Sequence, residues 1–185
     1  MPKGLRIFFK YLNRYFMVPL FRLGLGSVMT NPFSGYIMVM KTIGSKSGKV
    51  RYVPVNYAIW KGNVYCISGG GDRADWYKNL VAQPQIEIIM PGGAIFGKVA
   101  TPYMGEGRLP IIRQILKNAG FAGFFEGYNP ITIEDEQLAI KTSDFPLIEI
   151  TPIGLGAGAS DPRGWAWILW TVVGILIILG LIILL

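Results

Sequence analysis

A short run of basic, hydroxyl and glycine residues is the part of the chain best suited to chemistry with an anion. It covers residues 44–51 and reads Gly-Ser-Lys-Ser-Gly-Lys-Val-Arg. Glycines expose backbone N–H groups in a concave turn, serines add hydroxyl donors, and the guanidinium of Arg51 can hold two phosphate oxygens at once. The run therefore predicts a phosphate site, although turns between strands are also often charged simply because they face water.

The spacing of this run excludes a nucleotide-triphosphate loop. Its glycines are one residue too close together, and Val50 stands where such a loop has a Ser or Thr for magnesium. Gly69, Gly70 and Gly71 likewise lack the spacing and the βαβ context of a dinucleotide fingerprint. Nucleotide-triphosphate chemistry is therefore not expected.

The composition removes further classes of chemistry. Histidine is absent and Cys66 is the single cysteine, which excludes a histidine-based triad, a Cys/His zinc site and an internal disulfide. Carboxylates cluster only at residues 134–136, which we interpret as a solvated turn at the start of a helix. The net charge of +7 implies an anionic partner, such as nucleic acid, acidic lipid or a phosphorylated ligand.

The elements that must position the basic run are predicted from residue patterning. From Tyr36 onward, short stretches rich in Val, Ile and Tyr alternate with glycine, which is typical of antiparallel strands. We expect strands at residues 36–43, 50–60, 63–68, 85–90, 94–103 and 146–151, and helices at residues 75–82 and 109–118. The predicted fold class is mainly β with flanking helices (α+β).

Both ends of the chain predict helices of a different kind. Residues 1–25 place Lys3, Arg6, Lys10 and Arg14 on one face of an amphipathic helix, which either lies in a membrane interface or caps the core, with Pro19 as a kink or stop. Residues 165–185 carry no charge and, at about 1.5 Å per residue, are long enough to cross a hydrocarbon core of about 30 Å. We expect one C-terminal transmembrane helix.

The remaining segments complete the domain organisation. Residues 26–153 are expected to form one β-rich domain, and residues 154–164, rich in Gly, Ala and Pro, a linker to the anchor. Basic residues interrupt every apolar run near the N-terminus, so no cleavable signal is predicted. The expected location is a single-pass membrane protein whose soluble domain is cytoplasmic.

Three motifs in order resemble the deazaflavin-dependent nitroreductase family, whose members bind coenzyme F420. The first is the family's Gly-Arg-Lys-Ser-Gly followed by Arg and Pro, matched by residues 44–48, Arg51 and Pro54 with Ser45 in place of the Arg. The others are a strand ending in Gly-Gly, and a Trp before Asn-Leu and Ala-Asn-Pro. They are matched by Gly69-Gly70, Trp76, Asn79-Leu80 and Ala82-Gln83-Pro84, with Gln83 in place of Asn.

The resemblance covers about residues 36–151 and implies a split β-barrel of the FMN-binding type. It implies that Lys46, Ser47 and Arg51 hold the coenzyme's phosphate. The chain along Tyr52, Val53, Pro54, Val55 and Asn56 would line the ring. The other side of the ring would be closed by Ile67, Ser68, Gly69 and Gly70 and by Asp75, Trp76, Tyr77, Lys78 and Asn79.

A deazaflavin transfers hydride itself, so a chain without histidine can perform the reaction by orienting the coenzyme and excluding water. A proton can come from water or from a tyrosine, with Tyr57 and Tyr128 as candidates. Tyr128 falls in residues 120–130, a stretch rich in glycine and aromatic residues that is either a mobile wall of the site or a packed loop.

Membrane attachment favours a small apolar acceptor such as a quinone, which Phe121, Phe124 and Phe125 would suit. The alternative is a non-catalytic accessory subunit of a larger membrane complex that retains the fold and contacts other membrane subunits. A variant of the first hypothesis replaces F420 with FMN or haem. The ordered motifs argue against a purely lipid-binding, basic peripheral protein, and no nucleic-acid partner is expected.

Overall fold

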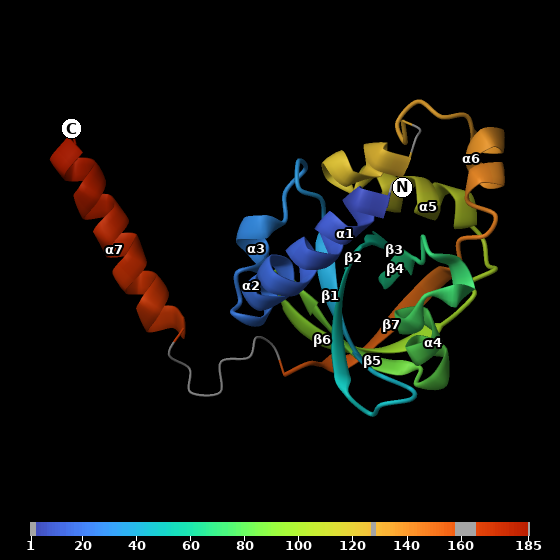
Figure 1. Cartoon of the computed structure of the whole chain (residues 1–185), viewed down its shortest axis with the longest axis horizontal. Coiled ribbons are helices and arrows are strands. Elements are labelled where there is room, and N and C mark those ends of the chain that lie inside the picture. Colours follow the sequence, from blue (N-terminus) through green and yellow to red (C-terminus); the bar gives the residue numbers. More distant parts are fainter. Residues whose placement is uncertain (1–2, 127–128, 158–165, 185) are drawn as a thin grey trace.

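The computed structural model describes residues 3–126, 129–157 and 166–184. Within them, seven strands form one antiparallel sheet in the order β2-β1-β5-β6-β7-β4-β3, with helices packed on both sides (Figure 1). The strands are β1 Ile37–Ile43, β2 Val50–Asn56, β3 Ala58–Trp60, β4 Asn63–Ile67, β5 Gln85–Met90, β6 Gly93–Ala100 and β7 Leu147–Leu155. The predicted fold class is confirmed.

The order of the strands explains why the sheet curls into a split barrel. Its two edge strands, β2 and β3, follow one another in the chain and are separated by Tyr57 alone. The sheet must therefore bend until its edges are neighbours. Tyr57 stays bonded at this crossing, since its N–H donates to the carbonyl of Tyr36 (3.3 Å) and its carbonyl accepts from Nδ2 of Asn118 (2.8 Å). The single strand predicted over residues 50–60 is consequently two strands.

The interior of the barrel packs against α4 (Asp75–Ala82), whose bounds match the prediction. Tyr77 and Leu80 of this helix are buried against strand residues such as Met38 and Ile148. The contact forms because Tyr77 and Leu80 lie three positions apart and so share one face of the helix. α4 is thereby held rigidly at the side of the barrel.

A second cluster covers the outside of the sheet beneath α5 (Arg108–Lys117) and α6 (Asp135–Lys141). Ile111, Ile112 and Ile115 recur at helical spacing and are at most 2% exposed. α6 begins within residues 134–136, as predicted for a solvated helix start, and packs on the sheet through buried Leu138. The ion pair between Arg113 and Asp135 (2.5 Å) joins the two helices.

The N-terminal segment is helical from Lys3 to Arg22 in three parts, namely α1 (Lys3–Leu12), a π-helical turn (Asn13–Met17) and α2 (Val18–Arg22), and a short α3 (Gly26–Met29) follows. Pro19 lies at the start of α2 and does not stop the helix, because the wider π-helical turn comes directly before it. Met17 and Phe21 are buried against the sheet. Tyr11 and Tyr15, in contrast, are more than half exposed. The segment therefore caps the core with one face and leaves an apolar face outside.

The C-terminal part of the chain leaves the sheet later than predicted. β7 runs to Leu155 because it stays paired with β6, so the start of the predicted linker is strand, and residues 158–164 of that linker lie outside the described residues. α7 (Ala166–Leu184) is, by length and composition, able to cross a membrane. No residue of its window Trp167–Leu184 is buried against the rest of the described structure, and Figure 1 shows it standing apart.

Candidate cofactor and substrate site

A cavity of about 450 Å³ opens between the barrel, α4 and the N-terminal helix. Its volume is typical of small-molecule sites, and the described residues that line it include no charged side chain. The lining residues are Phe9, Leu12, Asn13, Phe16, Met17, Met29, Ser34, Ile37, Pro54, Val55, Asn56, Ile67, Gly69, Trp76, Ile115, Leu116, Ala119, Phe121, Ala122, Gly123 and Phe145. Such a cavity suits a flat, largely apolar ring.

Six of the residues predicted to contact a coenzyme line this cavity, and they come from three separate elements. They are Pro54, Val55 and Asn56 of β2, Ile67 and Gly69 at the end of β4, and Trp76 at the start of α4. The fold thus brings residues of all three motifs to one cavity. Trp76 is held in place by an edge-to-face contact with Tyr77, with ring centroids 6.4 Å apart.

Other predicted residues turn away from the cavity. Ser68 is buried and its hydroxyl donates to the carbonyl of Gly71 (2.7 Å), while the hydroxyl of buried Tyr77 accepts from Thr101 (3.0 Å). Val53 packs into the barrel core, and the ring of Tyr52 lies under the guanidinium of Arg22. Gly70 and Tyr77 border a second, more polar hollow, and Asp75 and Lys78 lie exposed on α4.

The basic turn presents charged and hydroxyl side chains rather than the free backbone donors that were expected, because the N–H groups of residues 44, 45 and 47–49 are already bonded within the protein. The N–H of Gly44 donates to the carbonyl of Lys49 (2.9 Å), and a Cβ at Gly44 would lie only 2.7 Å from the hydroxyl oxygen of Ser47, so a side chain at Gly44 would displace that hydroxyl. Lys46, Ser47 and Arg51 are all exposed, and neither Lys46 nor Arg51 forms an ion pair within the described residues. Their charges remain available to a phosphate.

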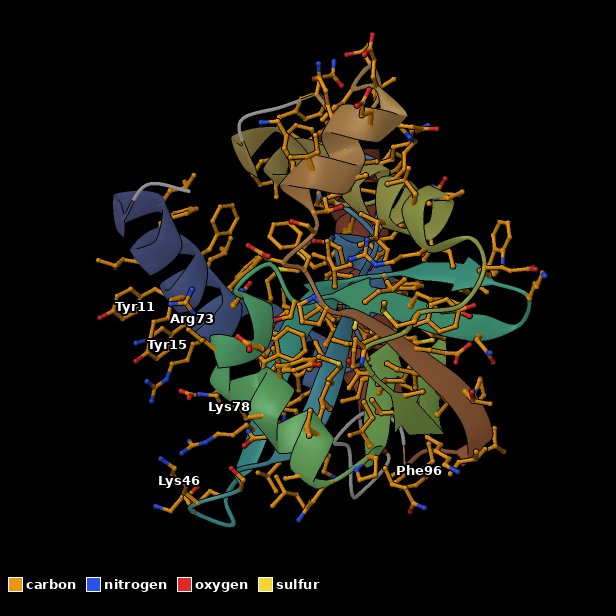
Figure 2. All side chains as sticks on the ribbon, turned by 90° about the vertical axis from the view of Figure 1, so that its right-hand side faces the viewer. Tyr11, Tyr15, Lys46, Arg73, Lys78 and Phe96 are labelled. Atoms are coloured by element: carbon orange, nitrogen blue, oxygen red, sulfur yellow. The ribbon has the colours of Figure 1, made fainter. Side chains whose placement is uncertain are left out.

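The turn and the cavity are joined along β2. Arg51 precedes Pro54 by three residues, which places the turn about 10 Å from the cavity at the usual rise of about 3.3 Å per residue. Figure 2 shows Lys46, Lys78 and Arg73 pointing to the same side of the molecule as Tyr11 and Tyr15 of the N-terminal segment. A ligand with an apolar ring and a phosphorylated tail could therefore occupy both features at once.

Asn79 connects the basic turn to α4. Its side-chain oxygen accepts a hydrogen bond from the N–H of Ser45 (2.9 Å), and Asn79 is only 8% exposed. Trp76, which lines the cavity, lies one helical turn earlier on the same helix. We expect Asn79 to position the phosphate-binding turn relative to Trp76, a role that needs no direct contact with the ligand.

Asn79→Ala should free the N–H of Ser45 and weaken binding of a phosphorylated coenzyme about tenfold, the net value of one hydrogen bond of about 1.4 kcal/mol. Hydrogen exchange at Ser45, measured without ligand, should accelerate. Asn79→Asp keeps the acceptor and should restore slow exchange at Ser45. Unchanged exchange in Asn79→Ala would show that the bond does not hold the turn.

The two tyrosines predicted as proton donors are placed differently. Tyr57 is half-buried beside the barrel core and is not among the residues that line the cavity. Burial, with a smaller contribution from Tyr36, raises the pKa of the Tyr57 hydroxyl, which therefore stays protonated at neutral pH. Tyr128 lies outside the described residues.

The stretch predicted as either a mobile wall of the site or a packed loop borders the cavity. It begins with a 3₁₀ segment (Gly120–Glu126), of which Phe121, Ala122 and Gly123 are lining residues. Gly120 has φ +57°, and any Cβ there would collide with the carbonyl oxygen of Phe33, so glycine is required. The ring of Phe121 stacks on Phe9 of α1 at 6.3 Å, which closes the cavity on that side. Phe124 is half exposed, and the side chain of Phe125 lies outside the described residues.

The N-terminal helix is the part of the site that the sequence analysis did not place there. Phe9, Leu12, Asn13 and Phe16 all line the cavity. Their spacing of three, one and three residues defines one helical face, and this was the available signal. The same pattern is expected of a helix that only caps a core, so the pattern alone does not separate the two roles.

The curled antiparallel sheet, its flanking helices and the apolar cavity define a split β-barrel protein. The chain belongs to the F420H(2)-dependent quinone reductase family, whose model matches residues 21–126. The match runs from α2 to the 3₁₀ segment and so includes the basic turn, α4 and most of the cavity lining. Membership of this family supports a deazaflavin-dependent oxidoreductase.

Similar solved structures are distant in sequence. They include a putative pyridoxamine 5'-phosphate oxidase from Listeria innocua, with 10% identity over 68% of this chain and 90% of that chain and a TM-score of 0.46. The haem storage protein HutZ from Vibrio cholerae has 15% identity over 77% and 92%, with a TM-score of 0.43. A haem-binding protein from Mycobacterium smegmatis has 16% identity over 69% and 50%, with a TM-score of 0.44. No curated protein sequence matches the chain.

Proposed function

We propose that this protein is a membrane-anchored oxidoreductase that transfers hydride from reduced coenzyme F420 to a small apolar acceptor such as a quinone. The observation that carries the proposal is the apolar cavity joined along β2 to an exposed cationic turn. Family membership also supports the proposal, because the name of the family states both the coenzyme and the acceptor.

The residues present fit this coenzyme. The exposed cations Lys46 and Arg51 suit the coenzyme's phosphate, and the uncharged cavity suits its deazaflavin ring. When bound, the deazaflavin supplies the hydride. Val55 and Trp76 would hold the ring from two sides, and the stack of Phe9 on Phe121 would keep water out.

Asn56 has a supporting role at the cavity wall. Its Nδ2 donates to the carbonyls of Tyr36 (3.3 Å) and Asn118 (3.4 Å), which fixes the amide and leaves its side-chain oxygen as an oriented acceptor beside the cavity. The N-terminus of α4, at Asp75 and Trp76, adds the positive end of a helix dipole close to the ring. Both features would orient the coenzyme and stabilise negative charge on its reduced form.

The acceptor is proposed to be apolar because the cavity and the anchor favour the same kind of molecule. Phe16 of the π-helical turn and Phe121 of the 3₁₀ segment line the cavity, and their rings would pack against an aromatic or quinoid acceptor beside the coenzyme. α7 would hold this site beside a bilayer, in which apolar quinones dissolve. We place the barrel on the cytoplasmic side, and its protection from protease added to intact cells would test that placement.

The proposal is tested with the full chain in detergent. F420, FMN and haem are offered separately, and reduced F420 is then mixed with a short-chain quinone while the absorbance of the oxidised coenzyme is followed. Binding of F420 alone and oxidation that depends on the quinone are the expected results. Tight binding of FMN or haem instead of F420 would mean that the cofactor is FMN or haem. Binding of none of the three would favour a non-catalytic subunit of a membrane complex.

A further inference from the structure

The chain leaves the barrel at a fixed point. The N–H of Gly156 donates to the carbonyl of Ala94 (2.9 Å), and the N–H of Ala157 donates to Oε1 of Glu87 (2.6 Å). Glu87 is only 4% exposed, and its other carboxylate oxygen is paired with Nζ of Lys41 (2.9 Å). The end of β7 is therefore clamped to the sheet as far as Ala157.

Exposed apolar side chains surround this exit. Leu155 is 89% exposed, Ile153 is 56% exposed and Phe96 is 43% exposed. The register of β6 and β7 pairs Phe96 with Gly154 and Ile95 with Leu155, so Phe96 and Leu155 lie at the same end of this strand pair but on opposite faces of it, and apolar side chains cover both faces of that end. We call Phe96, Ile153 and Leu155 the exit patch. Phe96 projects from the lower end of the barrel in Figure 2.

The exit patch lies within a short tether of the apolar helix. Eight residues, 158–165, separate Ala157 from the start of α7, and even a fully extended chain of that length spans only about 30 Å. α7 begins with exposed Trp167 and Trp170, the side chains that favour the interface between headgroups and hydrocarbon. The end of α7 nearest the barrel is therefore the end that meets the membrane surface.

We infer that the exit patch is a lipid-binding surface that rests in the interfacial layer of the same bilayer that holds α7. The inference rests on the proposed membrane anchor. Exposed Lys98, two residues beyond Phe96 on β6, adds a charge that suits anionic headgroups. Anchor and patch together would fix the orientation of the barrel at the membrane, because the clamp at Glu87 leaves β7 no freedom to turn.

Labelling of a single introduced cysteine tests the inference on the full chain. Native Cys66 is fully buried and burial raises the pKa of its thiol to about 12, so it should stay unlabelled at neutral pH. Leu155→Cys and the control Ile140→Cys, on α6 and 69% exposed, each receive an environment-sensitive fluorophore. Each protein is reconstituted in phosphatidylcholine–phosphatidylglycerol vesicles that contain lipids with a headgroup quencher.

The label at residue 155 should be quenched at least about threefold more than the label at residue 140, as for side chains inserted in a membrane interface. Adding Phe96→Asp and Ile153→Asp should reduce quenching at residue 155 to the control level while the protein still sediments with vesicles. Equal quenching at residues 155 and 140 in protein that sediments with vesicles would contradict lipid binding by the exit patch and leave the membrane anchor in place. Strong quenching of a label at Tyr11→Cys with none at residue 155 would show that the N-terminal segment, and not the exit patch, contacts the membrane. Failure of the protein to sediment with vesicles would contradict the membrane anchor as well.

Discussion

Gly69→Phe is expected to lower kcat/KM for reduced F420 by at least about a hundredfold, or about 2.7 kcal/mol, with little change in the melting temperature. Gly69 lines the cavity at the end of β4, and a Cβ added there meets no atom within 4 Å. Its φ lies outside the left-handed region, so a side chain brings no backbone strain. The phenyl ring would occupy the space proposed for the deazaflavin ring.

A matched control separates loss of space from loss of stability. Gly92, in the turn between β5 and β6, also has no atom within 4 Å of an added Cβ and no left-handed φ, but it is exposed and does not line the cavity. Gly92→Phe should keep normal activity and a normal melting temperature. If the Gly69→Phe protein bound F420 with unchanged affinity, the coenzyme could not bind in this cavity.

The strand pattern was predictable from local sequence, because each strand is a short run of apolar and β-branched residues bounded by turn residues. β5 and α4 were predicted to the residue. The break at Tyr57 was not predicted, because residues 50–60 form one continuous strand-like run. Only long-range pairing assigns the two halves of this run to opposite edges of the sheet. The acidic residues 134–136 indicated the start of α6, but the body of the helix was not predicted because Leu138 is its one buried residue.

The lining of the cavity was predictable only where a motif indicated it. The motifs placed Pro54, Gly69 and Trp76 together, and all three line the cavity. The same reasoning could not tell that Ser68 and Tyr77, inside the motif regions, bond to other parts of the protein. The direction of a side chain near a strand end depends on local twist and packing, which sequence spacing does not specify.

The role of Asn79 shows the same limit in another form. Its partner is a backbone N–H 34 residues away, and a bond between a side chain and a distant backbone group leaves no periodic trace in the sequence. Because the partner is the backbone of Ser45, the bond is indifferent to the side chain at that position. Ser45 in place of the family's Arg therefore leaves this connection between turn and helix intact.

Lys46→Ala with Arg51→Ala is expected to weaken F420 binding by about 3 kcal/mol, roughly a hundredfold in Kd, because two charge-assisted hydrogen bonds to phosphate are lost. Both side chains are exposed, so their removal should leave the fold unchanged. Fluorescence titration of the full chain in detergent measures the change. The salt dependence of binding should also become shallower.

The control must remove the same charge elsewhere. Lys98→Ala with Lys117→Ala takes two positive charges from exposed positions that do not line the cavity or the turn, and so lowers the net charge of +7 by the same amount. If a general attraction between a basic protein and an anionic coenzyme governed binding, both double variants would weaken it alike. A specific phosphate site requires that only the change at Lys46 and Arg51 does so.

Kinetics then locate the turn relative to the chemistry. Because the turn lies about 10 Å along β2 from the cavity, it should hold the coenzyme equally in the ground state and the transition state. The Lys46→Ala, Arg51→Ala protein should therefore show a raised KM for reduced F420 and a nearly normal kcat when the coenzyme is saturating. A large fall in kcat with an unchanged KM would mean that these two cations act on the reacting ring, and the phosphate-binding turn would have to be assigned elsewhere.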